Sequence, residues 1–261
     1  MRSLSVISIA LLAGAALAQA QRPSDADAEA AIEQSRQKAL AYAKSLPDFV
    51  CTELIHRFYD TRHRGAWNPL DKLTIKLSYF EQKEDHKLML IDGKPTDREF
   101  GSLEGASGVG EFGGTLRSIF DPASRATFHW ESWKTVRKHR AAVYSYVVEA
   151  AYSRYTLMTG AVGSYNKAVV GFHGVLEIDA ESGAVLHFTY EADHIPKELK
   201  LESAITKVDY DFADVGGRDY LLPSHSETEM HNPTVWMWNQ MEFRQYSKFG
   251  SESIINFDTG K

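Results

Sequence analysis

Residues 24–46 have the polar and apolar pattern of an amphipathic helix. Ser24 suits the N-cap position, Asp27 follows three residues later, and the rest is rich in Ala, Glu, Gln and Lys, which favour helices. Pro47 ends the pattern, and Ser35 is the polar interruption of the apolar face. That face comprises Ala28, Ile32, Ala39, Tyr42, Ala43 and Leu46. The segment predicts a helix of about five turns that packs against the rest of the protein.

After Pro47 the apolar residues recur at every second position. Residues 72–79, 142–148 and 206–212 alternate most clearly, as half-buried strands do. Turn signals containing glycine separate such runs at residues 92–95, 181–183 and 216–217. About eleven candidate strands lie between Phe49 and Phe257. The pattern therefore predicts a mainly β protein with a large antiparallel sheet, forming a single domain over residues 21–261.

Two segments depart from this alternation. Residues 101–114 contain six glycines and lead into a short helix expected near Thr115–Phe120. A loop of this length is either a functional lid or a disordered segment. The run at residues 168–178 is apolar at both odd and even positions. It predicts a strand buried on both sides, in a sheet with a helix on one face and other structure on the second.

The first twenty residues have the features of a secretory signal peptide. Arg2 precedes an apolar run over residues 6–17, and small residues offer cleavage after Ala20 or after Ala18. A buried N-terminal helix is the less favoured alternative. We expect cleavage near Ala20 and a mature chain in the periplasm or secreted. The only cysteine, Cys51, lies too far downstream for lipidation, so we expect a soluble chain without a stable membrane anchor.

Charge and cysteine content narrow the possible partners. The formal net charge of −6 becomes −7 when Arg2 is removed with the signal peptide. Basic residues are also scattered along the chain, so nucleic acid is not expected as a partner. A single cysteine excludes an internal disulfide, and Cys51 is expected to be a buried apolar residue rather than a nucleophile.

No motif isolates a reaction. The glycines at residues 108–113 have the G-x-G-x-x-G spacing, but their antiparallel context favours a flexible loop over a dinucleotide site. If residues 225–231 form a strand, His225, Glu227, Glu229 and His231 share one of its faces. This pattern is typical of a solvated polar surface, which is favoured over a metal site that assists hydrolysis. Asp193-His194 is expected in a turn, because Pro196 follows. We therefore expect no enzymatic activity, no catalytic residue, no metal ion and no cofactor.

Aromatic residues are abundant, with five Trp, twelve Tyr and thirteen Phe. Most are expected to fill the core. Two pairs, Trp130 with Trp133 and Trp236 with Trp238, are also candidates to line a cavity for an apolar ligand. Trp236 and Trp238 would share a face if their segment is a strand.

The C-terminal half resembles a known superfamily. The hairpin Gly174-Val175-Leu176-Glu177-Ile178-Asp179, its turn through Gly183 and the strand from Ala184 are similar to a hairpin of exported bacterial LolA/LolB-like proteins, known from outer-membrane lipoprotein sorting. Val208-Asp209-Tyr210 through Gly216-Gly217 to Pro223 resembles the next two strands. The match covers roughly residues 165–230, with a compatible helix at 24–46.

This resemblance implies an unclosed antiparallel half-barrel whose concave face holds helices, and either lipid or acyl-chain carriage or a sensor role. Our leading hypothesis is a soluble, non-enzymatic binding protein with a curved half-barrel sheet packed on the N-terminal amphipathic helix. It would carry a lipid or acyl ligand in the concave face, under a lid at residues 101–120. The alternative is an envelope protein–protein interaction or sensor module without a cavity. No ligand-binding residue transfers from the resemblance.

Overall fold

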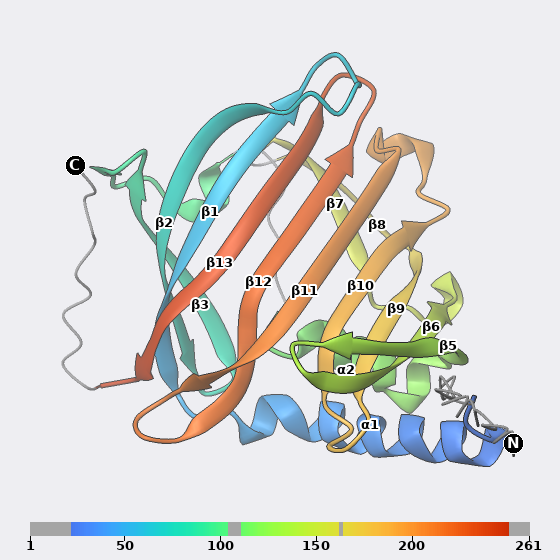
Figure 1. Cartoon of the computed structure of the whole chain (residues 1–261). Coiled ribbons are helices and arrows are strands. Elements are labelled where there is room, and N and C mark those ends of the chain that lie inside the picture. Colours follow the sequence, from blue (N-terminus) through green and yellow to red (C-terminus); the bar gives the residue numbers. More distant parts are fainter. Residues whose placement is uncertain (1–21, 104–110, 162–163, 251–261) are drawn as a thin grey trace, which may run out of the picture.

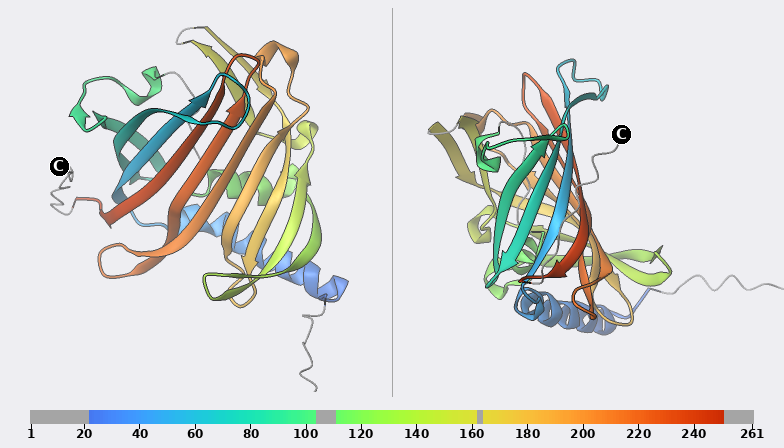
Figure 2. Two further views of the ribbon diagram at one scale, coloured as in Figure 1. Left: turned by 45° about the horizontal axis from the view of Figure 1, so that its top comes forward. Right: turned by 90° about the vertical axis from the view of Figure 1, so that its left-hand side faces the viewer.

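The computed structural model describes residues 22–103, 111–161 and 164–250, and its centre is a curved sheet of eleven strands. The strand order is β4-β3-β2-β1-β13-β12-β11-β10-β9-β6-β5, and neighbouring strands are antiparallel. The end strands β4 and β5 do not pair with each other, so the sheet remains unclosed. Figures 1 and 2 show that the sheet is curved and that helix α1 runs across its lower end. The predicted half-barrel with an N-terminal helix is confirmed.

The described elements follow one another with few long connections. The helices are α1 (Asp25–Ser45) and α2 (Gly114–Phe120), with 3-10 turns at Phe100–Ser102, Pro122–Ser124, Ala150–Tyr152 and Lys197–Leu199. The strands are β1 (Phe49–Asp60), β2 (Asn68–Phe80), β3 (Lys83–Ile91), β4 (Lys94–Pro95), β5 (Thr127–Val136), β6 (His139–Val148), β7 (Thr156–Ala161), β8 (Ser164–Val169), β9 (Gly171–Asp179), β10 (Val185–Asp193), β11 (Ser203–Asp214), β12 (Asp219–His231) and β13 (Trp236–Lys248).

Helix α1 begins and ends where the sequence predicts. The Ser24 hydroxyl accepts a hydrogen bond from the Asp27 N–H at 3.2 Å and donates one to the Asp27 carboxylate at 2.6 Å. Ile32 and Ala39 are buried against the sheet, as expected for the apolar face. Ser35 is also fully buried, and its hydroxyl donates to the Ala31 carbonyl at 2.9 Å. The polar interruption is therefore satisfied within the helix.

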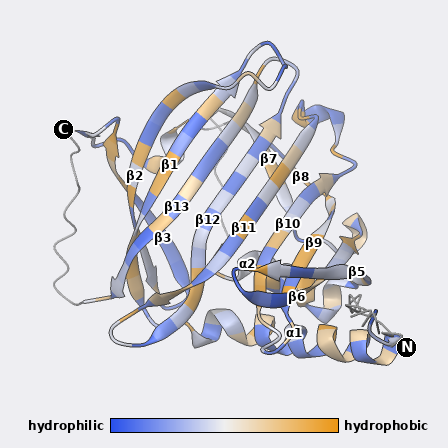
Figure 3. Cartoon of the chain, in the orientation of Figure 1, coloured by the Kyte–Doolittle hydropathy of each residue, from blue (hydrophilic) through white to orange (hydrophobic). Residues whose placement is uncertain are grey.

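The two faces of the sheet have different environments. We call the face covered by α1 and α2 the inner face and the opposite one the outer face. One apolar core joins both helices to β6, β9, β10 and β11, and a second joins β1, β2 and β13. The outer face is largely polar, and Figure 3 shows hydrophilic and hydrophobic positions alternating along the strands. Cys51 lies fully buried in the second core, and burial raises the pKa of its thiol.

The apolar run at residues 168–178 is not one continuous strand, so that expectation is wrong. β8 ends at Val169 and pairs with β7 in a separate two-stranded sheet, whereas β9 starts at Gly171 in the main sheet. The chain turns at Val170, whose N–H bonds to the Tyr155 carbonyl at 3.0 Å. Within β9, Phe172 is buried on the inner face, while His173 is partly exposed on the outer face. The run is apolar on both sides because it serves two sheets.

Candidate ligand-binding site

Most of the inner face is filled by side chains. Leu116, Ile119 and Phe120 of α2 are buried in the core formed with α1 and the strands β6 and β9–β11. The large, fully buried strand side chains of this core are Tyr144, Tyr146, Phe172, Phe188 and Tyr210. The short helix predicted near Thr115–Phe120 is therefore confirmed, and it forms part of the packed interior.

A cleft remains where α1 crosses the lower end of the sheet, and we call it the α1 cleft. Its volume is about 320 Å³. Its walls are mostly apolar and come from both helices, from the start of β10 and from the β11–β12 region. The lining residues are Lys38, Ala39, Ala41, Tyr42, Ser45, Leu46, Leu116, Ala184, Val185, Tyr210, Asp219, Tyr220 and Leu221.

The Tyr42 and Tyr210 hydroxyls in the walls of the α1 cleft are paired with protein groups. The Tyr42 hydroxyl donates to the Leu221 carbonyl at 2.8 Å, and its ring meets Tyr210 edge-on with centroids 5.8 Å apart. The Tyr210 hydroxyl donates to the Glu111 carbonyl. Burial raises the pKa of both phenols well above the usual range. The two tyrosines therefore present ring surface to the cleft and keep their hydroxyls occupied elsewhere.

Lys38 is the cationic residue of the cleft lining, and it lies exposed at the rim. Across the described ranges, no ion pair involves its ammonium group. Asp219 supplies a carboxylate on the sheet side of the lining. The α1 cleft thus combines apolar walls with a charged rim.

Trp130 and Trp133 lie on β5 and pack against the helix-covered core. Their rings meet edge-on with centroids 6.3 Å apart, and the Arg140 guanidinium lies 3.8 Å from the centre of the Trp133 ring. Trp130 lines a separate hollow of about 630 Å³ near the start of α1. Charged residues Arg22, Asp25, Glu29 and Arg36 also line this hollow, which makes it more polar than the α1 cleft.

Trp236 and Trp238 share one face of β13, but it is the outer face. Trp236 is stacked between His63, at 5.2 Å, and His231, at 3.9 Å between ring centroids. Trp238 packs against Phe58 and Trp67. The alternate residues Met241 and Phe243 occupy the inner core. The four tryptophans therefore form two groups on opposite faces of the sheet, and they do not line one cavity.

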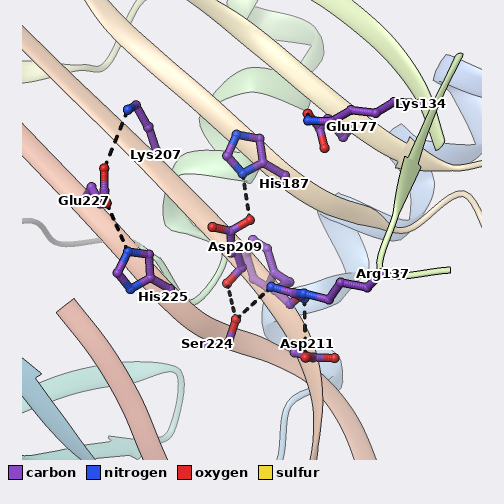
Figure 4. A network of polar contacts seen from close by, with 11 residues as sticks. Lys134, Arg137, Glu177, His187, Lys207, Asp209, Asp211, Ser224, His225 and Glu227 are labelled. Carbon is purple, nitrogen blue, oxygen red and sulfur yellow. Dashed lines mark hydrogen bonds and ion pairs between the residues drawn. The ribbon is translucent and has the colours of Figure 1, made fainter. Parts of the chain in front are cut away.

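His225 and Glu227 of β12 belong to a polar network on the outer face (Figure 4). His225 contacts Glu227 at 3.3 Å, and Glu227 also lies 3.6 Å from the Lys207 ammonium group. On the adjacent strands, His187 contacts Asp209 at 2.9 Å. Burial alone would raise the pKa values of Asp209 and Glu227, but hydrogen bonds and nearby positive charges together outweigh it and lower both pKa values. The histidine partners are the first of these opposing contributions.

The remaining histidine motifs also form pairwise contacts. His231 contacts Glu229 at 2.5 Å, and His173 contacts Asp193 at 2.8 Å. β10 ends at Asp193, and His194 has a positive φ of 51°, so the turn predicted there is confirmed. Within the described ranges, no group of three or more His, Cys, Asp or Glu residues is arranged to hold a metal ion.

The glycine-rich segment is described only in part. Residues 104–110, which include two glycines of the G-x-G-x-x-G spacing and seven of the twenty residues of the expected lid, lie outside the described residues. The signal peptide predicted at residues 1–20 does so as well. No helix of the described part is long and apolar enough to cross a membrane.

A buried group of ionisable residues lies beside the second core, and no sequence motif predicted it. His86 Nδ1 contacts the Glu53 carboxylate at 3.0 Å, and His86 Nε2 lies 3.5 Å from Glu84. Glu111 is nearby and buried, with Ser226 Oγ at 3.5 Å. Burial, then repulsion from Glu84 and Glu53, raises the pKa of Glu111 to about 8. Burial alone would lower the pKa of His86, but its hydrogen bonds with Glu53 and Glu84 raise it to about 10.

Comparison with known proteins finds no matching family model and no matching curated protein. A solved structure from Vibrio parahaemolyticus, described as an outer membrane lipoprotein-sorting protein domain, is 10% identical with a TM-score of 0.37, covering 89% of this chain and 97% of its own. A DUF1329 family protein from Desulfovibrio piger is 9% identical, with a TM-score of 0.36 and coverage of 86% and 94%. A LolA superfamily protein from Nitrosomonas europaea is 6% identical, with a TM-score of 0.33 and coverage of 90% and 97%. Similarity at this level carries no argument about function.

Proposed function

We propose that this chain is a non-enzymatic binding protein that takes one slender apolar ligand, such as a single acyl chain, into the α1 cleft. The observation that supports the proposal is the apolar cleft of about 320 Å³ between α1 and the inner face. Ligand pockets usually occupy about 300–1,000 Å³, so this cleft suits one acyl chain rather than a branched lipid. Two acyl chains would require the packed core around Leu116 to open.

Apolar burial would supply most of the affinity. Each buried methylene contributes about 0.8 kcal/mol, whereas an exposed ion pair contributes about 0–1 kcal/mol. Lys38 at the rim would therefore orient an anionic head group, while the length of the apolar chain would set the dissociation constant. We expect affinity to rise with each methylene until the cleft is full.

The proposal includes export of the chain. A basic residue, an apolar run and small residues occur in the order of a signal peptide within residues 1–20. In this account the mature protein binds its ligand outside the cytoplasm. N-terminal sequencing of the exported protein would test this part, with cleavage after Ala20 or Ala18 as the expected result and an intact N-terminus as the contradictory one.

Filling the cleft with a large side chain tests the binding proposal. Ala41 lines the cleft and is exposed, so Ala41→Trp places an indole there without disturbing the core. We expect this variant to bind a fluorescent fatty acid at least tenfold more weakly than the parent chain. Ala30→Trp is the matched control, because Ala30 is an exposed alanine of the same helix that does not line the cleft.

The control variant should bind like the parent chain. Equal binding by the parent and by Ala41→Trp would rule out the α1 cleft as the binding site. Absence of fatty acid binding in all three proteins, together with no lipid extracted from the purified parent, would instead support an interaction module without a ligand.

A further inference from the structure

We propose that Met158, Met230 and Met237 form a second site, which binds a soft monovalent metal ion such as Cu(I) or Ag(I) through their thioether sulfurs. The three side chains line one groove of about 460 Å³. We call it the methionine groove. It lies between the small sheet β7–β8, the turn at Lys197–Leu199 and the adjoining ends of β12 and β13.

The backbone brings these methionines together from three separate strands. Met230 of β12 and Met237 of β13 are direct cross-strand partners in the main sheet. Side chains of such partners lie about 4.5–5.5 Å apart at Cβ, within reach of one shared ion for a side chain as flexible as Met. Met158 comes from β7 of the small sheet and lines the same groove.

The exposure of Met158 argues against a role in packing alone, whereas Met230 also packs against the small apolar cluster of Leu157, Val170, Leu199 and Ala204. Met158 is 61% exposed, the largest value among the exposed large hydrophobic side chains of the described residues. Met230 and Met237 are only partly buried, whereas Met241, on the same strand as Met237, is 1% exposed and belongs to the second core. The sequence has six methionines, so half of them line this groove.

The donor chemistry favours a soft ion over a hard one. Thioether ligands select Cu(I), whereas carboxylates and carbonyls select Mg²⁺ and Ca²⁺. Glu198 and Lys200 are the charged residues in the lining of the groove, and Leu199 and Leu201 are apolar. The competing soft donor, Cys51, is fully buried in a different core. The methionine groove, whose lining holds three thioethers and one side chain of each charge, is therefore an accessible soft site within the described ranges.

Substitution by leucine separates metal binding from apolar packing, because leucine keeps the apolar volume and removes the sulfur. Purified full-length chain would be titrated with Ag(I) in chloride-free buffer and followed by calorimetry. We expect one ion per chain, at least tenfold weaker binding in each of Met158→Leu, Met230→Leu and Met237→Leu, and no binding in the triple variant. Met89→Leu and Cys51→Ala should bind like the parent chain.

A spectroscopic measurement on the unsubstituted chain covers the case in which a variant fails to fold. With ¹³C-labelled methionine methyl groups, Ag(I) should shift the resonances of Met158, Met230 and Met237 and leave Met89 and Met241 in place. The proposal is overturned if the parent chain binds no Ag(I), if Cys51→Ala alone abolishes binding, or if the shifted methyl groups are not these three.

Discussion

Glu111 is a carboxylic acid enclosed by the protein, and its pKa of about 8 makes stability depend on pH. Its ordinary pKa is 4.5, so the unfolded chain loses this proton at lower pH than the folded chain does. The stabilisation that results from the raised pKa of Glu111 is fully present below pH 4.5 and is lost as pH rises through 8. His86, with its pKa raised from 6.5 to about 10, acts in the same direction at higher pH.

Replacing Glu111 by Gln should remove the part of this dependence that lies between pH 4.5 and 8. Glutamine keeps the shape of the side chain and cannot ionise, so Glu111→Gln should be more stable than the parent at pH 8.5. The difference should shrink towards pH 5. Urea unfolding of both proteins at pH 5, 7 and 8.5 measures it. Parallel curves of unfolding free energy against pH would show that Glu111 does not titrate in this range. Loss of stability above pH 8 should persist in the variant, because His86 is unchanged.

At the scale of elements, the close approach of β9 to β10 depends on Gly174. A Cβ at this position would lie 1.9 Å from the Thr189 carbonyl oxygen, which also accepts a hydrogen bond from the Tyr146 hydroxyl at 2.8 Å. The clash is with backbone, so the strands themselves must separate. Gly174→Ala should therefore lower the unfolding free energy by about 3 kcal/mol, the upper end of overpacking costs.

Gly101 provides the comparison for this substitution. A Cβ there would meet no atom within 4 Å, so Gly101→Ala should change the unfolding free energy by no more than about 0.5 kcal/mol. Chemical denaturation of the full chain would measure both changes in unfolding free energy. A difference between the two variants of less than 1 kcal/mol would show that β9 and β10 separate at low cost.

The elements with strong local signals could be predicted from the sequence. Ser24 and Pro47 bound the N-terminal helix, and period-two alternation located the strands, because caps and alternation are local properties. The break at Val170 could not be predicted, since the neighbouring residues Ala168, Val169 and Phe172 are apolar and give no turn signal. The sequence also does not show which face of the sheet Trp236 and Trp238 occupy, because both faces of β13 carry apolar side chains.

The residues of the candidate sites are brought together by strand pairing and packing, and no local sequence motif marks them. Glu53 and His86 are far apart in the sequence and meet only after β1, β2 and β3 pair in their particular alignment, and Glu111 reaches them from the segment before α2. The residues that line the α1 cleft have the composition of ordinary core positions, so the sequence could not separate them from the core. Trp130 lines the hollow at the start of α1, and Trp133 packs against Trp130 beside it. A role of these two residues in ligand binding stays a prediction that is separate from the α1 cleft.

On the scale of the whole molecule, an unclosed sheet of eleven strands surrounds an interior that its helices fill only in part. α1 crosses the lower end of this sheet, as Figure 1 shows, and leaves the α1 cleft between itself and β10–β12. The methionine groove lies at a different place, beside β7–β8. One molecule thus offers an apolar cleft and a thioether-lined groove that can be tested separately.

Residue-resolved NMR of the ¹⁵N-labelled full chain, titrated with octanoate, tests most directly whether the α1 cleft binds an apolar chain. The account predicts saturable amide shifts centred on the cleft-lining residues Tyr42, Leu116, Val185 and Leu221. Shifts centred on Trp130 or on the outer-face residues Trp236 and Trp238 would place the ligand elsewhere and contradict the account, as would the absence of any saturable shift.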